Sequence, residues 1–221
     1  MKDLISTGIL AFSFLLLFAV AELLYHKLKV KAELTRKLVH FGTGIITLLF
    51  PVMLNNHWLV LLLCLSFAII LLLSIKFDLL KSINAIDRES LGSLLYPVSV
   101  YGCYLVFNYH TDNYIYFYIP ILLLAICDPI AALTGKKWPI RKYSVGKNHK
   151  SLMGSTMFFI SAIAVCYSIF ILNDYFLPIL KTSIIIAGLT CLAEAMSSRG
   201  YDNLTIPLSA IMAIELSARI L

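Results

Sequence analysis

Charged residues are scarce in this chain of 221 residues: only 14% are Asp, Glu, Lys or Arg, whereas 60% are hydrophobic. A soluble domain is on average about a quarter charged and about half apolar. The mean hydropathy of the chain, +0.89, is correspondingly high. This composition excludes a disordered chain and a nucleic-acid-binding module with a solvated surface, and it predicts a protein that lies mostly in lipid.

Patterns typical of several other protein classes are missing as well. The five cysteines all lie in apolar runs, without a Cys-x-x-Cys pair or a histidine at ligand spacing, so neither a disulfide framework nor a zinc site is expected. No apolar run alternates with a period of two, which disfavours a β-barrel. The Walker A pattern of phosphate-binding loops is also absent.

Eight apolar segments approach the 17–25 residues, roughly, that a helix needs to cross the hydrocarbon core. They are Leu4–Leu24, Leu38–Leu54, Trp58–Ile75, Leu91–Phe107, Tyr114–Leu133, Leu152–Leu172, Leu177–Met196 and Leu204–Leu221. The fourth and the last are short and flanked by polar residues. We predict an all-α, polytopic transmembrane helix bundle of about eight spans, with residues 1–221 forming a single integral membrane domain.

The basic residues predict how this bundle is oriented. Fifteen of the eighteen lysines and arginines fall in alternate connections, and only Lys2, Lys181 and Arg219 fall on the opposite side. Cytoplasmic connections carry the excess of basic residues, so both termini are expected outside. The run Ala19–Ala21 imitates a signal-peptidase site, but cleavage there would leave the basic segment 27–37 outside, against the same rule.

Polar residues concentrate at the cytoplasmic ends of these predicted helices. Arg36, Lys37 and His40 open the second helix, and Arg36 and His40 share a face because they are four residues apart. Gly42 and Gly44 follow and allow a close approach of another helix or a ligand. A basic membrane anchor with one hydrogen-bonded histidine is the alternative interpretation of this segment.

The pair Asp128-Pro129 is expected to interrupt the fifth helix near its cytoplasmic end, because proline lacks an N–H. A carboxylate at that depth needs a partner, which is either a structural salt bridge or a cation or metal–phosphate site. The loop from Thr134 to Ser151 then carries Lys147 and Lys150, and Ser151 is a plausible N-cap of the sixth helix. Lysines beside a helix N-terminus suit a triphosphate, or alternatively anionic lipid headgroups.

Two further acidic positions lie on the same predicted side. Glu194 is near the inner end of the seventh helix, and Asp202-Asn203 begins the eighth. Together with Asp128, these residues are expected to converge at one depth. Carboxylates and an amide oxygen are ligands that Mg²⁺ accepts, and Mg²⁺ carries substrate phosphates.

The order and spacing of these residues resemble the dolichol kinase and phytol kinase family, over the region from about Arg36 to Pro207. The matching stretches are Arg36–His40, Asp128–Ala131 with Gly135, Lys150–Ser155, and Glu194 with Ser197, Gly200, Asp202 and Asn203. Arg88, with Gly92 and Tyr96-Pro97, matches a further segment. The family has Glu where this chain has Met153, and many members have Gly where it has Cys127.

The resemblance implies a polytopic membrane enzyme that transfers the γ-phosphate of CTP, or another nucleoside triphosphate, to a lipid alcohol such as dolichol, polyprenol or phytol. Its implied partners are the nucleotide, the lipid alcohol and the bilayer, with Mg²⁺ as cofactor and no nucleic acid. The implied location is a prokaryotic cytoplasmic membrane, with the active site on the cytoplasmic side. No oligomeric state is predicted.

The clustering and the resemblance together predict the site residues. Catalytic roles are expected for Asp128, Lys150 and His40; phosphate binding for Arg36, Lys37, Arg88, Lys147, Ser151, Gly154 and Ser155; and metal binding for Asp128, Glu194, Asp202 and Asn203. Of the two groups that can accept the proton, Asp128 is preferred to His40.

Three other functions remain open at this point. A CTP-dependent diacylglycerol kinase would use a similar site. A phosphatidate cytidylyltransferase would share the nucleotide and the metal, but its usual C-terminal signature is missing here. A non-enzymatic membrane protein is the third, and a transporter would place charges near the bilayer midplane rather than at one interface.

Overall fold

Helices make up nearly all of the structure, a computed structural model that describes residues 2–85, 90–111, 113–146, 148–173 and 178–221. The helices are α1 (Lys2–His26), α2 (Ala32–Thr47), α3 (Phe50–Met53), α4 (His57–Lys76), α5 (Lys81–Asn84), α6 (Gly92–Tyr109), α7 (Ile115–Leu122), the π-helical turn η1 (Leu123–Cys127), α8 (Asp128–Lys137), α9 (Leu152–Leu172), α10 (Ile179–Met196) and α11 (Asp202–Ile220). The predicted all-α class is confirmed, apart from one hairpin.

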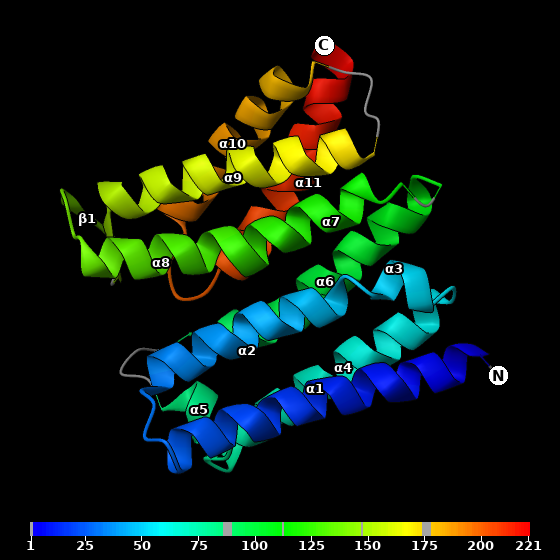
Figure 1. The fold of residues 1–221 in the computed structure, drawn as a ribbon, viewed down its shortest axis with the longest axis vertical. Coiled ribbons are helices and arrows are strands. Elements are labelled where there is room, and N and C mark those ends of the chain that lie inside the picture. Colours follow the sequence, from blue (N-terminus) through cyan, green and yellow to red (C-terminus); the bar gives the residue numbers. More distant parts are fainter. Residues whose placement is uncertain (1, 86–89, 112, 147, 174–177) are drawn as a thin grey trace.

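The long helices run back and forth between two ends of the molecule (Figure 1). One end carries α5, the connection between α1 and α2, and the hairpin that precedes α9, whereas both chain termini lie away from this end. The segment α7–η1–α8 lies in the middle of the bundle, between α2 on one side and α9 on the other. The end that carries the hairpin is called the hairpin end below.

Five helical segments of the described chain are long and apolar enough to cross a membrane. They are Lys2–His26, His57–Lys76, Ile115–Lys137, Leu152–Leu172 and Ile179–Met196. In Ile115–Lys137, which comprises α7, η1 and α8, 72% of the most apolar window is buried inside the protein, against 22–33% in the other four. This segment is therefore surrounded by protein, while the others expose apolar surface suited to lipid. The predicted total of eight spans stays a prediction.

The second predicted span is divided in two. The prediction placed one helix over Leu38–Leu54, but α2 already begins at Ala32 and ends at Thr47, and α3 follows at Phe50. Pro51 explains the break because it has no N–H to donate to the preceding turn, and proline is favoured at the first positions of a new helix. The eighth helix begins at Asp202, as predicted, two residues before the apolar span Leu204–Leu221.

The long loop after the fifth helix contains regular structure that the sequence did not predict. Helix α8 continues to Lys137, and strands β1 (Lys142–Val145) and β2 (Asn148–Ser151) then pair antiparallel, with Lys142 opposite Ser151. The turn includes Gly146, whose φ of +59° is a conformation that glycine adopts without strain. The prediction that Asp128-Pro129 interrupts the fifth helix is wrong. The segment stays helical throughout, because the π-helical turn η1 ends directly before Asp128 and α8 begins there.

Two close contacts between helices depend on glycine. A Cβ atom at Gly154 would lie 2.9 Å from the carbonyl oxygen of Ala131, so α8 and α9 approach each other closely there. A Cβ atom at Gly44 would lie 2.2 Å from the Cβ atom of Ala125, which brings α2 against η1. The predicted close approach at Gly44 is thus confirmed, and the contact at Gly154 holds α8 and α9 together beside the cleft described next.

Candidate active site

A polar cleft of about 660 Å³ opens at the hairpin end, between α2, α8, the hairpin, and the ends of α9, α10 and α11 that meet there. It is lined by Glu33, Lys37, Asp128, Ala131, Ala132, Gly135, Lys136, Pro139, Lys142, His149, Lys150, Ser151, Gly154, Ser155, Glu194 and Asp202. Segments far apart in the sequence therefore contribute charged groups of both signs to one space. This volume is within the range of about 300–1,000 Å³ that is typical of small-molecule sites.

Asp128 lies at the inner wall of this cleft, paired with Lys37 of α2 and close to His40 of the same helix. Its Oδ2 atom is 3.1 Å from Lys37 Nζ and 3.8 Å from His40 Nε2, and only 7% of the residue is exposed. A buried carboxylate needs such partners to stay charged. The predicted basic cluster at the start of the second helix is therefore the partner of the predicted acidic residue in the fifth.

The π-helical turn before Asp128 explains the position of His40. In a π-turn the carbonyl of residue i accepts from the N–H of residue i+5, which for Leu124 is Pro129, and proline has no N–H. The Leu124 carbonyl instead lies 2.9 Å from His40 Nε2. Because a carbonyl oxygen only accepts, His40 Nε2 is the donor in this contact and carries a proton.

Asp202 brings a second carboxylate to the cleft from the first turn of α11. Partial burial and the negative charge of Asp128 raise the pKa of the Asp202 carboxyl above its usual value, whereas Lys150 and Lys37 oppose this rise. Two carboxylates that disfavour each other's charge form a place where a cation is stabilised.

Lys150 and Glu194 form a second buried ion pair at the cleft. Lys150 Nζ donates to Glu194 Oε1 at 2.5 Å and also to the main-chain carbonyl of Glu194. The other carboxylate oxygen, Oε2, is buried and has no hydrogen-bond partner among the described residues. Glu194 therefore holds the Lys150 ammonium in place, and its predicted role as a metal ligand stays a prediction.

The N-terminus of α9 points its free N–H groups toward the same space. Ser151 is the N-cap, as predicted, because its Oγ accepts from the N–H of Gly154 at 3.2 Å. Ser155 Oγ lies 2.7 Å from the hydroxyl of Tyr143 in β1, which ties the hairpin to the helix. A helix N-terminus beside lysine side chains is a general anion-binding arrangement.

A smaller polar cavity of about 50 Å³, called the throat below, lies directly behind the cleft. Its lining residues are Arg36, Lys37, His40, Ser90, Gly92, Asp128, Arg199, Gly200, Asp202 and Asn203. Three of them, Lys37, Asp128 and Asp202, also line the cleft. The two spaces therefore meet at the two carboxylates.

Close main-chain packing shapes the throat. Asn203 Nδ2 donates to the carbonyl oxygen of Gly92 at 2.6 Å, and the N–H of Leu91 donates to the carbonyl oxygen of Arg199 at 2.9 Å. Gly200 has a φ of +87°, and a Cβ atom there would lie 2.3 Å from the nitrogen of Gly92. Only glycine fits this position. The amide of Asn203, predicted as a metal ligand, is thus engaged with the start of α6.

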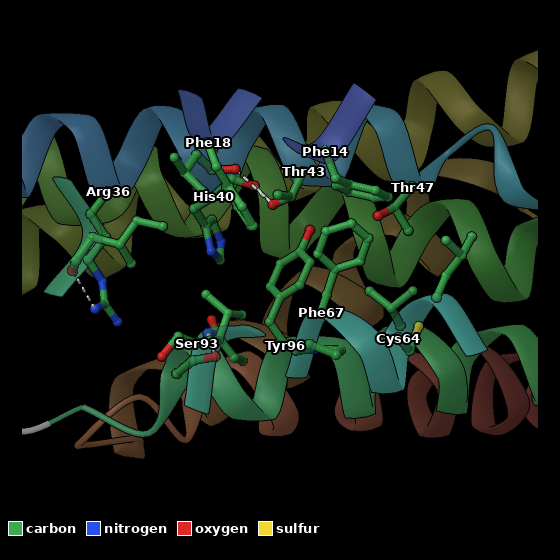
Figure 2. A pocket seen from close by; sticks show the side chains of 18 of the residues that line it. Phe14, Phe18, Arg36, His40, Thr43, Thr47, Cys64, Phe67, Ser93 and Tyr96 are labelled. Carbon is green, nitrogen blue, oxygen red and sulfur yellow. Dashed lines mark hydrogen bonds between the residues drawn. The ribbon is translucent and has the colours of Figure 1, made fainter. Parts of the chain in front are cut away.

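An apolar pocket extends from the throat into the bundle (Figure 2). It is lined by Phe14, Phe18, Arg36, Val39, His40, Thr43, Thr47, Phe50, Leu63, Cys64, Phe67, Leu71, Ile83, Gly92, Ser93, Tyr96, Pro97, Val100 and Asn203. Figure 2 shows Arg36, His40 and Ser93 at one end of this pocket and Thr47 and Cys64 at the other. The throat therefore joins a polar space to an apolar one.

The structure brings most of the predicted site residues together. The cleft contains Lys37, Asp128, Lys150, Ser151, Gly154, Ser155, Glu194 and Asp202, and Arg36, His40 and Asn203 line the throat. Arg88 and Lys147 lie outside the described residues. Five further lining residues were not predicted from the sequence: Glu33, Lys136, Lys142, His149 and Arg199. The sequence shows only that these residues lie in or beside the polar, mostly basic stretches between apolar segments. That position does not distinguish a residue that lines the cleft from one that faces solvent.

The residues present suit a metal ion that is shared with a ligand. Among the described residues no group of three or more His, Cys, Asp or Glu side chains is arranged to hold a metal ion alone. Asp128 and Asp202 nevertheless face the same cleft, and Mg²⁺ is usually bound by one or two carboxylates, waters and substrate phosphates. The donor set therefore fits Mg²⁺ together with phosphate oxygens.

The fold and the site define an integral membrane protein with a polar cleft, lined by charged side chains of both signs, at one end of its helical bundle. No family model and no solved structure matches the chain. Phytol kinase from Synechocystis sp. is 31% identical over 198 residues, which cover 87% of this chain and 83% of the relative. The chain belongs to the family of phytol and dolichol kinases, which are membrane phosphotransferases.

Proposed function

We propose that this kinase transfers the γ-phosphate of CTP to a membrane isoprenoid alcohol, such as phytol, a polyprenol or dolichol. The observation that carries the proposal is the meeting of the polar cleft and the apolar pocket at the throat, beside Asp128. A lipid kinase needs such an arrangement, because its donor is soluble in water and its acceptor is soluble in lipid. The relative named above is a phytol kinase, which supports this class of acceptor.

The nucleotide is expected to occupy the cleft. Lys150, held by Glu194, and the N–H groups at the start of α9 supply positive charge and donors for a triphosphate. Lys37 faces the cleft from α2, close to Asp128. Mg²⁺ bound by Asp128, Asp202 and phosphate oxygens would neutralise charge on the transferred group.

The acceptor hydroxyl is expected in the throat, where its oxygen attacks the γ-phosphorus. The new oxygen–phosphorus bond forms as the bond to the departing nucleoside diphosphate breaks, and the hydroxyl proton passes to Asp128. Asp128 suits this role better than His40, because His40 Nε2 is already a donor to the Leu124 carbonyl. Lys150 and Lys37 offset the negative charge that develops on the phosphoryl oxygens.

The proposed location is the cytoplasmic side of a prokaryotic inner membrane. Most lysines and arginines of the sequence lie in the connections at the hairpin end, and cytoplasmic connections carry this excess. The cleft opens at the same end. A nucleotide from the cytoplasm would therefore reach the cleft without crossing the bilayer.

One labelling experiment tests the proposal against its alternatives. The purified chain receives CTP labelled on either the α- or the γ-phosphate, with isoprenoid alcohols, diacylglycerol or phosphatidate as acceptor. Label from the γ-phosphate alone in an isoprenoid phosphate is the expected result. Label in diacylglycerol alone would indicate a diacylglycerol kinase, and label from the α-phosphate a cytidylyltransferase. No labelled lipid with any acceptor would overturn the kinase assignment, and ATP and UTP in parallel test donor choice.

A further inference from the structure

We infer that Arg199 binds the transferred phosphoryl group from the side of the throat and then holds the phosphate of the lipid product. This inference rests on the proposed function, because it assigns a further phosphate-binding residue in that reaction. Arg199 is not among the site residues predicted from the sequence.

Arg199 lies in the tight turn that connects α10 to α11. The N–H of Tyr201 donates to the carbonyl oxygen of Ser198 at 3.0 Å, and the two residues between them, Arg199 and Gly200, have φ values of +52° and +87°. Two positive φ values in succession are typical of a type I′ turn, whose central positions favour asparagine followed by glycine. Arginine is not a residue that this turn favours, so the backbone does not explain its presence.

The main chain of Arg199 is held in place by the start of α6. Its carbonyl oxygen accepts from the N–H of Leu91 at 2.9 Å, and the next residue, Gly200, packs directly against Gly92. The Arg199 side chain, which lines the throat, therefore starts from a fixed point.

Two other cations of the throat already have partners, whereas Arg199 does not. Lys37 Nζ is 3.1 Å from Asp128 Oδ2, and Arg36 Nη2 donates to the hydroxyl of Ser90 at 2.9 Å. No hydrogen bond or ion pair joins the Arg199 side chain to another residue that the structure describes. The N–H donors of its guanidinium are therefore available to a ligand.

The throat has the size and the position to receive a phosphoryl group. Its volume of about 50 Å³ is several times the roughly 10–15 Å³ that one water molecule requires. It meets the cleft at Asp128 and Asp202, where the proposed Mg²⁺ would share phosphate oxygens. A guanidinium presents parallel N–H donors that match two oxygens of one phosphate. Arg199 thus supplies from the throat the positive charge that Lys150 supplies from the cleft.

The position of Arg199 determines the stage of the reaction at which it acts. As the alcohol oxygen bonds to the γ-phosphorus and the bond to the nucleoside diphosphate breaks, the phosphoryl group passes from the cleft to the throat, and the hydroxyl proton goes to Asp128. Arg199 lines the throat but not the cleft, where the nucleotide is expected. Loss of Arg199 should therefore weaken binding of the transition state and of the lipid phosphate, but not of the nucleotide.

The substitution Arg199→Asn tests the inference, because asparagine suits the turn but lacks the guanidinium. The matched control is Lys29→Asn: Lys29 is an exposed basic residue with a φ of +54°, and it lies outside the cleft, the throat and the apolar pocket. Arg199→Gly is the second variant, for the case that the asparagine variant does not fold. Transfer of γ-phosphate from CTP to geranylgeraniol, inhibition by geranylgeranyl phosphate and by CDP, and thermal unfolding in detergent are measured for each purified chain.

The expected result is a selective loss. In Arg199→Asn, kcat falls and the inhibition constant of geranylgeranyl phosphate rises, each at least about tenfold, because charge-assisted donors to the phosphoryl group are lost. The KM for CTP and the inhibition constant of CDP stay unchanged, and the unfolding temperature does not fall. Lys29→Asn leaves all of these quantities unchanged.

Three outcomes would overturn the inference. The first is an unchanged kcat and an unchanged inhibition constant of geranylgeranyl phosphate in both Arg199 variants. The second is an equal loss of affinity for CDP, which would place Arg199 at the nucleotide. The third is a loss of activity with a lower unfolding temperature in both variants, which would indicate a structural role. If the unsubstituted chain labels no alcohol at all, the proposed function fails together with the inference, whereas the first three outcomes leave it standing.

Discussion

At the scale of single residues, Asp128 is the centre of the site because it contacts both Lys37 and His40 and faces the cleft and the throat. The sequence predicted this residue correctly as one that needs a partner, since an aspartate inside an apolar helix is costly without one. It left open whether the partner is structural or catalytic. The shared cleft favours a catalytic role, because a purely structural ion pair has no need of an adjoining space.

Replacing Asp128 by Asn should remove phosphate transfer. The amide has the same shape but cannot accept the hydroxyl proton, and loss of a general base typically lowers a rate by about 10²–10⁴-fold. The measurement is the initial rate of γ-phosphate transfer to the lipid. The control is Asp78→Asn, which changes an aspartate whose side chain is 82% exposed, at the same end of the molecule, and should leave the rate unchanged. Near-normal transfer by Asp128→Asn would exclude the assigned role.

The pH dependence should change when Lys37 is replaced by Met. Asp202 must be ionised to bind a metal ion, and burial and Asp128 raise its pKa while the positive charge of Lys37 lowers it. Without Lys37 the pKa of Asp202 rises further, so the acid limb of kcat/KM for the nucleotide should move to higher pH. Lys136→Met removes another lysine of the cleft and should leave the acid limb in place. A shift to lower pH in Lys37→Met would contradict this account.

The sequence could not predict the contacts of two site residues, Glu194 and His40. Glu194 was predicted as a metal ligand, but its partner Lys150 is 44 residues away, and only the packing of α10 beside the hairpin brings them together. His40 was a candidate base, and its protonated Nε2 follows from the carbonyl that Pro129 leaves without a main-chain donor. Both depend on contacts between elements, which spacing along the chain does not encode.

At the scale of elements, apolar runs were sufficient to place the long helices, because lipid requires continuous apolar surface. They were not sufficient for α3, for η1 or for the hairpin. The break before α3 depends on Pro51, and the strands are only four residues long in a stretch rich in charge. Short strands of mixed polarity carry little periodic signal, so pairing with a neighbouring strand determines them.

The contact between α8 and α9 should depend on Gly154. In Gly154→Ala the new methyl group would contact the carbonyl oxygen of Ala131. This oxygen belongs to the main chain and cannot rotate away as a side chain could, so α8 and α9 must move apart. Overpacking of this kind costs about 1–3 kcal/mol. Thermal unfolding in detergent should show the loss of stability, and the transfer rate should fall because Lys150 and Ser151 lie beside this contact.

The matched control for that substitution is Gly188→Ala. Gly188 lies inside α10, and a Cβ atom there meets nothing within 4 Å. Alanine is the better helix former by up to about 1 kcal/mol, so this variant should be at least as stable as the original chain. Equal stability of the Gly154 and Gly188 variants would show that the two helices are not held as closely as described.

At the scale of the whole molecule, the arrangement predicts which end of the bundle faces the cytoplasm. Ser144 in β1 is exposed at the hairpin end, and Asn55 is exposed between α3 and α4 at the opposite end. In intact bacteria, a membrane-impermeant maleimide should label Asn55→Cys but label Ser144→Cys only after the cells are opened. The unsubstituted chain is the control, because four of its five cysteines are buried and the fifth is partly so. The reverse labelling pattern would invert the proposed orientation.

The throat also has a consequence for how the rate must be measured. The throat connects the cleft, which is open to water, with a pocket lined by apolar side chains. The nucleotide is therefore supplied from the aqueous solution and the alcohol from the two-dimensional lipid layer. The velocity should follow the molarity of the nucleotide but the mole fraction of the alcohol among the surrounding lipids. Inert phospholipid added at constant total alcohol should therefore slow the reaction by surface dilution, although nothing in the aqueous solution has changed.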